Sequence, residues 1–283
     1  MLPIDFSATE KPAQVQENLI AYYRLFAGLP GMLMKDDAET FWFLSRKPAP
    51  GDMVLRARWA GEGERIEARI DSLFAQIGQH RDRIDWFVFP GDLPPDLNSR
   101  LERRGMPGGP GGNWLWADLA SLGDSPIAPG VAPIAPGVAP SAPGGFHIAQ
   151  VRDDRQMAEW IRVSELGFEH EELRDYYAAY TRHGYGPQAY SLHYIGDLDD
   201  NPVTSGTLLE AGGCASIYDL STPPAYRRQG FGSLLMRALM DEIRSRGYPD
   251  TWIWSSNIGK SVYQKLGYIE CDFGLREHTW KKG

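Results

Sequence analysis

The stretch AYRRQGFGSLLMRAL, residues 225–239, places two arginines and two glycines where an apolar helical pattern begins. Glycine costs about 1 kcal/mol relative to alanine in a helix interior, so its position here needs a reason. The first turn of a helix presents unpaired backbone N–H groups, and the helix dipole favours an anion there. Gly230 and Gly232 lack the Cβ atoms that would hold a phosphate away, and Arg227 and Arg228 add positive charge. The stretch therefore predicts a site for a phosphate-bearing cofactor, with a merely flexible turn as the alternative.

Two better-known phosphate loops do not fit this stretch. The dinucleotide fingerprint requires three glycines in a parallel βαβ unit, and only two are present. A P-loop requires G-K-[ST], which does not follow. The spacing alone therefore leaves the kind of cofactor open.

Composition narrows the class of protein. The 283 residues are 42% hydrophobic and 23% charged, as in a soluble globular protein, and no apolar run is long enough to span a bilayer. The two cysteines, Cys214 and Cys271, lack metal-ligand spacing, so we expect no metal site and a reducing, cytoplasmic location. A net charge of −8 argues against nucleic-acid binding and suits a cationic ligand.

One segment divides the chain. Residues 125–145, SPIAPGVAPIAPGVAPSAPGG, repeat the heptapeptide IAPGVAP and consist mainly of Ala, Pro and Gly. Such a segment lacks the large side chains that would offset its ordering entropy. We therefore expect a linker at 123–145 between an N-terminal domain, 1–122, and a C-terminal domain, 146–283.

The C-terminal domain shows alternating strand and helix patterns. Strands are predicted at 146–151, 189–196, 203–211, 214–222, 251–256 and 268–274, and helices at 154–167, 171–184, 231–246 and 258–267. In the helix that follows the glycines, we expect Leu234, Leu235, Ala238, Leu239 and Ile243 to face inward, and Gly247 to end the helix. The order of elements predicts an α/β domain with a mixed sheet flanked by helices.

At this point the chain resembles the GNAT superfamily of N-acetyltransferases. TPPAYRRQGFG is similar to the pyrophosphate loop of that family, [RQ]-x-x-G-x-[GA], placed between a bulged strand and a long helix. SSNIGKSVYQKLGY is similar to the second signature of the family, with Tyr263, Gly267 and Tyr268 in the matching positions. Ser256 stands where an Asn is more common, with Gly259 three residues later, so the contacts of this helix are less well specified. The resemblance covers residues 146 to about 275.

The resemblance implies acetyl-CoA as the cosubstrate and no metal. It assigns the cofactor contacts to Leu220, Ser221, Thr222, Arg227, Arg228, Gln229, Gly230, Phe231, Gly232, Ser233, Ser256, Asn257, Gly259 and Tyr263. It also makes Tyr263 the general acid for the departing thiolate, with a packing role as the alternative. A backbone N–H near 220–222 is the donor implied for the oxyanion.

The proton acceptor is open between two carboxylates. An amine with a pKa near 10.4 needs about 4.6 kcal/mol to lose its proton at pH 7, so direct attack requires a base. Asp219 precedes the point where the strand should splay, and Glu210 ends the strand before it, so Asp219 ranks first. For each of the two residues, however, burial statistics favour a solvated or hairpin-capping carboxylate over a base. The acidic, tyrosine-containing segment 164–177 would suit a cationic amine, although a solvated helix face explains it too.

The N-terminal half repeats the element order of the second half and is predicted to be a degenerate GNAT-like domain. RWAGEG, residues 58–63, fits R-x-x-G-x-G, but Glu62 and Glu64 beside the glycines would repel a pyrophosphate. Leu101 aligns with Tyr263, so the acid is missing. We therefore expect this half to be structural or to shape the acceptor site.

The sequence thus predicts direct acetyl transfer from acetyl-CoA to an amine in a ternary complex. No cysteine lies near the motifs to carry the acyl group. Two alternatives remain: a non-catalytic acyl-CoA sensor or partner-binding protein, and an acyltransferase for a protein N-terminus, a thiol or a hydroxyl. Acceptor identity and oligomeric state stay open.

Overall fold

The structure, a computed structural model, describes all residues except 1–2, 47–50, 123–144, 171–172, 187–188 and 190. Apart from Gly145, the predicted linker at 123–145 lies outside the described residues. The described chain forms two compact units. Unit 1 comprises Met1–Asn113 with Cys271–Gly283, and unit 2 comprises Trp114–Glu270.

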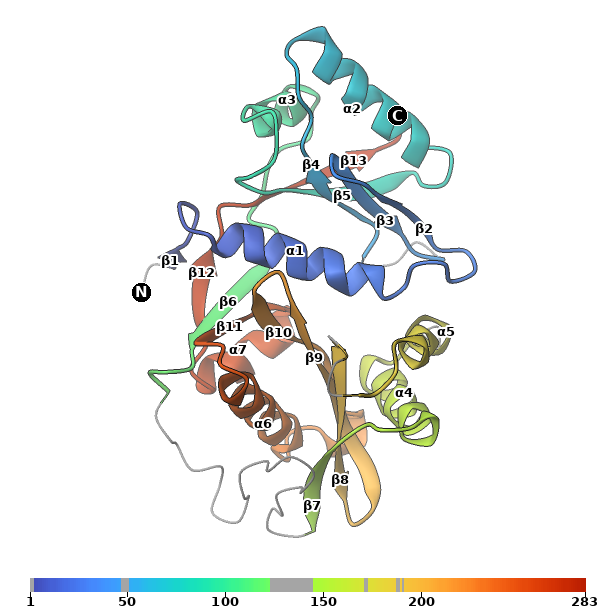
Figure 1. Cartoon of the computed structure of the whole chain (residues 1–283), viewed down its shortest axis with the longest axis vertical. Coiled ribbons are helices and arrows are strands. Elements are labelled where there is room, and N and C mark those ends of the chain that lie inside the picture. Colours follow the sequence, from blue (N-terminus) through green and yellow to red (C-terminus); the bar gives the residue numbers. More distant parts are fainter. Residues whose placement is uncertain (1–2, 47–50, 123–144, 171–172, 187–188, 190) are drawn as a thin grey trace. The chain divides into compact units, whose positions relative to one another are not determined.

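Unit 1 is a five-stranded mixed sheet with helices (Figure 1). Its elements are β1 (Ile4–Asp5), α1 (Lys11–Arg24), β2 (Leu33–Asp36), β3 (Thr40–Leu44), β4 (Met53–Ala57), α2 (Glu64–Ile77), β5 (Arg83–Val88), α3 (Leu97–Arg103) and β13 (Arg276–Lys281). The strand order is β13-β5-β4-β3-β2, with β4 and β5 parallel and the other pairs antiparallel. β1 pairs in parallel with Cys271 and Asp272, the last residues of β12.

Unit 2 is built on a larger mixed sheet. Its elements are β6 (Asn113–Asp118), β7 (Phe146–Gln150), α4 (Asp154–Phe168), α5 (Leu173–Tyr177), the 3₁₀ helix η1 (Ala178–His183), β8 (Ser191–Leu198), β9 (Asn201–Ala211), β10 (Cys214–Ser221), the 3₁₀ helix η2 (Pro224–Tyr226), α6 (Phe231–Ser245), β11 (Asp250–Ser255), α7 (Asn257–Lys265) and β12 (Ile269–Asp272). The strand order is β12-β6-β11-β10-β9-β8-β7, with β10 and β11 parallel. The predicted α/β class with mixed sheets flanked by helices is confirmed.

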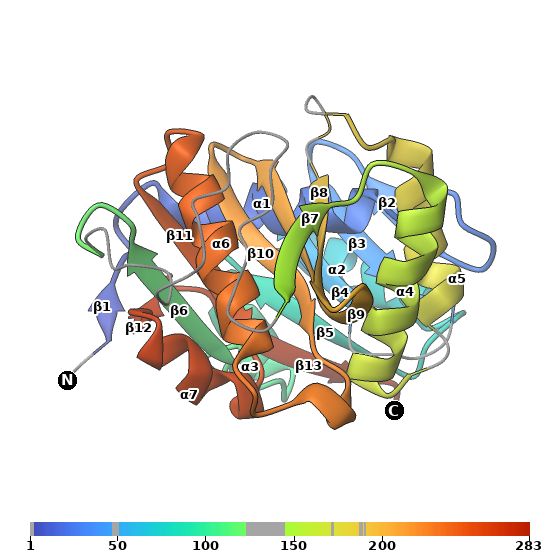
Figure 2. The same cartoon turned by 90° about the horizontal axis from the view of Figure 1, so that it is seen from below.

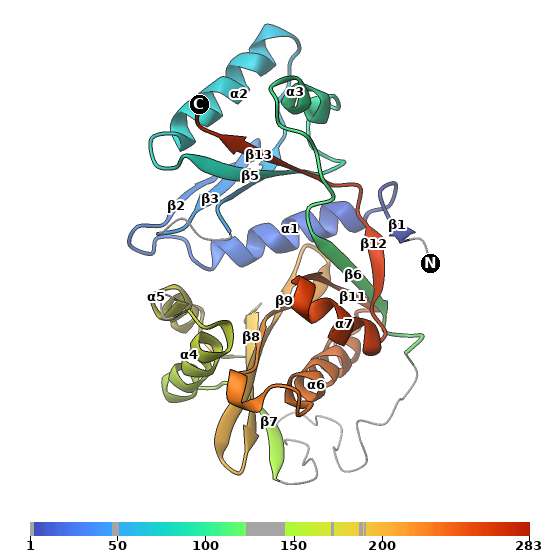
Figure 3. The same cartoon turned by 180° about the vertical axis from the view of Figure 1, so that it is seen from behind.

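Helices cover both faces of the unit 2 sheet. α4 and α5 lie on one face and α6 and α7 on the other (Figures 1 and 3). Figure 2 shows α6 along β10 and β11. Gly206 of β9 is in contact with helices on both faces of the sheet. Its carbonyl accepts a hydrogen bond from the Trp160 indole N–H of α4 (3.1 Å), and a Cβ at this position would contact Leu235 and Leu239 of α6.

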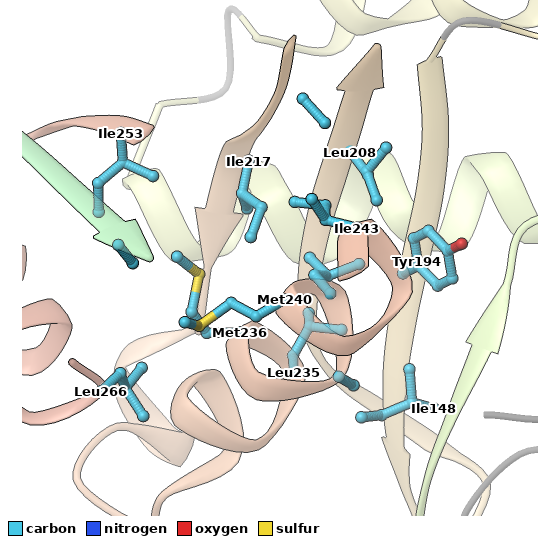
Figure 4. Packing of buried hydrophobic residues seen from close by; sticks show 14 of the residues in the cluster. Ile148, Tyr194, Leu208, Ile217, Leu235, Met236, Met240, Ile243, Ile253 and Leu266 are labelled. Atoms are coloured by element: carbon cyan, nitrogen blue, oxygen red, sulfur yellow. The ribbon is translucent and has the colours of Figure 1, made fainter. Parts of the chain in front are cut away.

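The core of unit 2 is the interface between α6 and the sheet. Leu235, Ala238, Leu239 and Ile243 are buried against the strands, as the helical spacing predicts, whereas Leu234 is only partly buried. Met236 and Met240, which lie outside the predicted set, are buried in the same cluster (Figure 4). Their partners in the same cluster are Ile148, Tyr194, Leu208, Ile217 and Ile253. A fully buried aliphatic side chain contributes about 1.5–3 kcal/mol, so this face holds the first turn of α6 firmly at the end of β10.

The compact units differ from the predicted halves by an exchange of strands. β6, which lies within the predicted N-terminal domain of 1–122, pairs with β12 inside unit 2. β13, which no sequence pattern predicts, pairs with all of β5 in unit 1. Its sequence REHTWK has too many charges for a strand pattern, but His278 is buried and its ring nitrogens contact the Met106 carbonyl and the Asn98 amide oxygen, both at 2.8 Å. These long-range contacts override the local pattern.

Candidate active site

The loop before α6 presents a row of free backbone donors. The N–H groups of residues 228–233 have no hydrogen-bond acceptor among the described residues, and the first paired amide is that of Leu234, which donates to the Gly230 carbonyl (3.0 Å). Arg228 and Gly230 have positive φ angles of 62° and 92°, which turn the chain into the helix. Consecutive free amides at a helix N-terminus form an anion site.

Gly230 and Gly232 of the loop are required for different structural reasons. A Cβ at Gly230 would meet no atom within 4 Å, so the space above this backbone is open and the positive φ favours glycine. A Cβ at Gly232 would lie 3.1 Å from the Thr222 hydroxyl oxygen. Gly230 therefore leaves room for a ligand, whereas Gly232 mainly lets α6 approach the end of β10.

The two arginines also differ. The Arg227 guanidinium donates to the carbonyls of Thr222 (3.0 Å) and Gly167 (2.6 Å) and pairs with Glu169 (3.5 Å). It thus braces α4 against the loop, which the sequence did not indicate. Arg228 is exposed and pairs with no described residue, so its charge faces the solvent beside the free amides.

β10 leaves its neighbour and bulges beside this loop. It is in register with β11 only at Ser216↔Trp252, and its register with β9 shifts between Tyr218 and Ser221. Asp219, inside the bulge, has φ 51°. The strand therefore has an edge beyond Ser216 that β11 does not cover.

The end of β10 is held in place by hydroxyl groups. The Ser221 carbonyl accepts from the Thr204 hydroxyl (2.7 Å), which also lies 3.0 Å from the Thr222 hydroxyl. The Ser221 and Ser205 hydroxyls are 2.9 Å apart. Leu220 packs on the apolar cluster beneath α6. The side chains of 220–222 thus fix the end of the strand.

The structure separates the two candidate bases. Asp219 lies in the bulge, where it accepts hydrogen bonds from the Tyr177 and Tyr180 hydroxyls at 3.1 and 2.6 Å. Glu210 lies at the other end of the β9–β10 hairpin, opposite Ala215, and forms an ion pair with Arg246 (3.1 Å) after the end of α6. Only Asp219 of this pair lies beside the loop and the uncovered edge of β10.

α7 presents the candidate acid. The Ser256 hydroxyl caps this helix by accepting from the Gly259 N–H (3.2 Å). A Cβ at Gly259 would lie 2.8 Å from the Tyr263 ring, so the glycine allows the ring to lie on the first turn. Burial raises the pKa of Tyr263 to about 12, which keeps the phenol protonated at neutral pH. Asn257 and Phe231 also lie at helix starts, and Phe231 stacks on Phe146 at 5.1 Å.

Two of the carboxylates in the acidic segment 164–177 are already engaged in ion pairs. Glu165 is buried and pairs with Arg174 (2.8 Å), and Glu169 pairs with Arg227. Residues 171 and 172 of the predicted acidic rim lie outside the described residues. The sequence did not indicate His193, whose ring packs at a tilt against Tyr180 with centroids 4.2 Å apart and whose pKa is lowered by burial to about 3. No sequence motif marks this histidine, because its neighbours come from distant elements.

In unit 1 the edge of β4 that β5 leaves uncovered is occupied by the segment around Leu93, which leaves a gap like that beside β10 filled. β4 and β5 are in register only at Met53↔Asp85 and Val54↔Trp86, and Leu93 then pairs beside β4, donating to the Ala57 carbonyl (2.8 Å). The Asp92 carboxylate beside it accepts from the Phe89 N–H (3.0 Å) and from the Gln16 amide (2.9 Å). This occupied gap and the fully buried Leu101 give the predicted degeneracy of this half a structural basis.

Neither a metal nor a membrane span is indicated in the part of the chain that the structure describes. No group of three or more His, Cys, Asp or Glu side chains there could hold a metal ion. None of the described helices is long and apolar enough to cross a bilayer.

Comparison with known proteins agrees with this geometry. Residues 155–268 match the acetyltransferase (GNAT) family model. A [ribosomal protein bS18]-alanine N-acetyltransferase of Haemophilus influenzae is 29% identical over 70 residues, which are 24% of this chain and 47% of that protein. The enzyme of the same name from Escherichia coli K12 is 34% identical over 59 residues, 20% of this chain and 40% of that protein. The matches thus span less than half of these relatives.

Solved structures show the fold of the whole chain. A GCN5-related N-acetyltransferase from Kribbella flavida has a TM-score of 0.59 at 14% identity and covers 94% of this chain and 96% of its own. A tandem GNAT protein from the clavulanic acid biosynthesis pathway has a TM-score of 0.58 at 17% identity, with coverage of 100% and 98%. The chain therefore carries a GNAT-family acetyltransferase domain in its C-terminal region, within a fold similar to that of a tandem GNAT protein.

Proposed function

We propose that unit 2 transfers an acetyl group from acetyl-CoA to an amine, by direct attack in a ternary complex. The row of free amides at 228–233 beside the uncovered edge of β10 carries this proposal. A hydrogen bond to a charged group contributes about 1.5–3 kcal/mol, so several of these amides could hold a pyrophosphate. Both cysteines are buried free thiols, and we propose a reducing cytoplasm as the location.

In the proposed reaction the amine nitrogen attacks the thioester carbonyl, so that a C–N bond forms and the C–S bond breaks. Asp219 is the proposed acceptor of the amine proton, since Glu210 is remote and paired. A backbone N–H of 220–222 would donate to the oxyanion, and the Tyr263 hydroxyl would give its proton to the departing thiolate. The remaining cofactor contacts are those proposed from the sequence, with Ser256 acting mainly as the cap of α7.

The first candidate for the acceptor is a small cationic amine, and the second candidate is the α-amino group of a protein N-terminus. The relatives named above are alanine N-acetyltransferases of a ribosomal protein. At pH 7 an α-amino group, with a pKa near 7.8, needs only about 1 kcal/mol to lose its proton, against about 4.6 kcal/mol for a lysine-type amine. Peptides with a free N-terminus and small cationic amines should therefore be compared by release of free CoA thiol.

Calorimetric titration with acetyl-CoA tests the binding half of the proposal. We expect one site per chain, because the gap in unit 1 is filled. Gly230→Glu should abolish binding, since it adds a side chain and a negative charge to the open side of the loop. Gly247→Glu is the matched control, because Gly247 has φ 89° at the other end of α6 and equally open surroundings. Absence of binding to the wild-type chain would refute the proposal.

Tyr263→Phe separates an enzyme from an acyl-CoA sensor. Loss of a general acid typically costs about 10²-fold or more in rate, so thiol release should fall by that factor while acetyl-CoA affinity stays unchanged. If the protein were a sensor, neither the wild-type chain nor Tyr263→Phe would show amine-dependent release of CoA thiol.

A further inference from the structure

The contact between Asp219 and two tyrosines lies where β10 is irregular. Asp219 is a non-glycine residue with positive φ, a conformation that is uncommon and persists when its surroundings hold it. Each carboxylate oxygen accepts from a different phenol, Oδ1 from Tyr177 and Oδ2 from Tyr180. The bulge is therefore tied to α5 and η1, about 40 residues earlier in the chain.

Both phenols are themselves rigidly placed. Tyr177 and Tyr180 are 3% and 0% exposed, and their rings stack on each other at 5.4 Å. Both also pack edge-on against Trp160 of α4, at 4.9 and 5.5 Å. Burial, and then the charge of Asp219, raise the pKa of both phenols well above 10, so each keeps its proton to donate.

We propose that Tyr177 and Tyr180 are positioning residues: with Asp219 they form a clamp that sets the bulged backbone of β10, and with it the place where the amine meets the acetyl group. The inference rests on the proposed function. The clamp lies on the α4 side of β10, whereas Leu220 of the same bulge packs toward α6. Its loss should therefore affect the amine and leave the pyrophosphate loop, on α6, intact.

A double-mutant cycle tests the clamp. Tyr180→Phe and Asp219→Asn remove one partner each, and asparagine tolerates the positive φ of residue 219. Tyr180→Phe should lower kcat/KM for the amine by about 10- to 100-fold, the loss of one hydrogen bond to a charged group. Asp219→Asn should lower it by at least as much, because it also removes the proposed base. The double variant should be no slower than Asp219→Asn alone. The calorimetric Kd for acetyl-CoA should stay within twofold of wild type in all three.

Tyr185→Phe is the matched control. The Tyr185 hydroxyl also donates to an aspartate, Asp154, at 2.7 Å, but outside the clamp, so its removal should leave kcat/KM unchanged. Wild-type kinetics in Tyr180→Phe, or losses that simply multiply in the double variant, would overturn the clamp. A merely structural contact would lower the urea midpoint of Tyr180→Phe without changing kcat/KM, and that result would overturn it too. If the wild-type chain acetylates no amine, the proposed function itself fails, and the positioning role with it.

Discussion

The contact between Gly259 and Tyr263 offers a test of the acid in which the phenol itself is retained. In Gly259→Ala the new Cβ would lie 2.8 Å from the Tyr263 ring carbon Cε2, and 3.3 Å from the Ser255 hydroxyl. Carbon atoms at optimal contact are about 3.5–4.0 Å apart, so the ring must retreat by roughly 0.7 Å or more. Backbone and helix capping at this position are compatible with alanine, because Gly259 is not among the glycines with positive φ.

The expected loss follows from this displacement. A misplacement of about 1 Å at a reacting group can cost about 10²-fold in rate, so kcat should fall by roughly 10- to 100-fold. Alanine favours the helix over glycine by up to about 1 kcal/mol, which offsets part of the steric cost. The variant should therefore stay folded and bind acetyl-CoA normally while turning over slowly.

The assay is steady-state release of CoA thiol, with acetyl-CoA affinity from calorimetry and stability from urea unfolding. Ser261→Ala, at an exposed position of the same helix, is the control and should behave as wild type. In a Tyr263→Phe background, Gly259→Ala should cause no further loss, because the displaced ring no longer carries the acid. Full activity of Gly259→Ala, or a further tenfold loss in that background, would refute the role of Tyr263.

Three other predictions concern parts of the structure that the sequence left open. Burial raises the pKa of Asp92 to about 6, above its unfolded value near 3.9, so the folded chain binds the extra proton between these values. The contribution of Asp92 to the free energy of unfolding should therefore fall by about 2 kcal/mol as the pH rises from 4 to 6. Urea titrations of Asp92→Asn should lack this fall, and equal pH dependences of the two chains would contradict the assignment. In Gly167→Ala the new Cβ would lie 2.7 Å from the Ser221 side chain and 3.0 Å from the Thr222 nitrogen. The free energy of unfolding should therefore fall by about 1–3 kcal/mol, and acetyl-CoA should bind more weakly. Wild-type values in both assays would show that α4 adapts freely. Glu210→Gln should keep kcat within about threefold and lower stability by less than about 1 kcal/mol, as for a partly exposed ion pair; a 10²-fold fall in kcat would restore Glu210 as the base.

The loop before α6 could be predicted from sequence because its signals are local. Gly230 and the apolar repeat of α6 lie within a few residues of each other, and both follow from helix geometry alone. The exchange of β6 and β13 could not be predicted in the same way. It depends on pairings with β12 and β5, which are more than 100 residues away in the chain, and the charges of β13 hide its strand pattern.

The place of Asp219 shows a second kind of limit. Side chains of a regular strand alternate between faces, so strict alternation would put Asp219 on the face of Ile217, which packs in the core beneath α6. The bulge between Tyr218 and Ser221 breaks this alternation, so that Leu220 takes the α6 side and Asp219 meets the tyrosines of α5 and η1. One extra residue in the strand thus turns a residue that would be buried in an apolar core into a charged group beside the proposed reaction centre. No periodicity in β10 encodes that shift, because the partners that hold it, Tyr177 and Tyr180, come from another part of the chain.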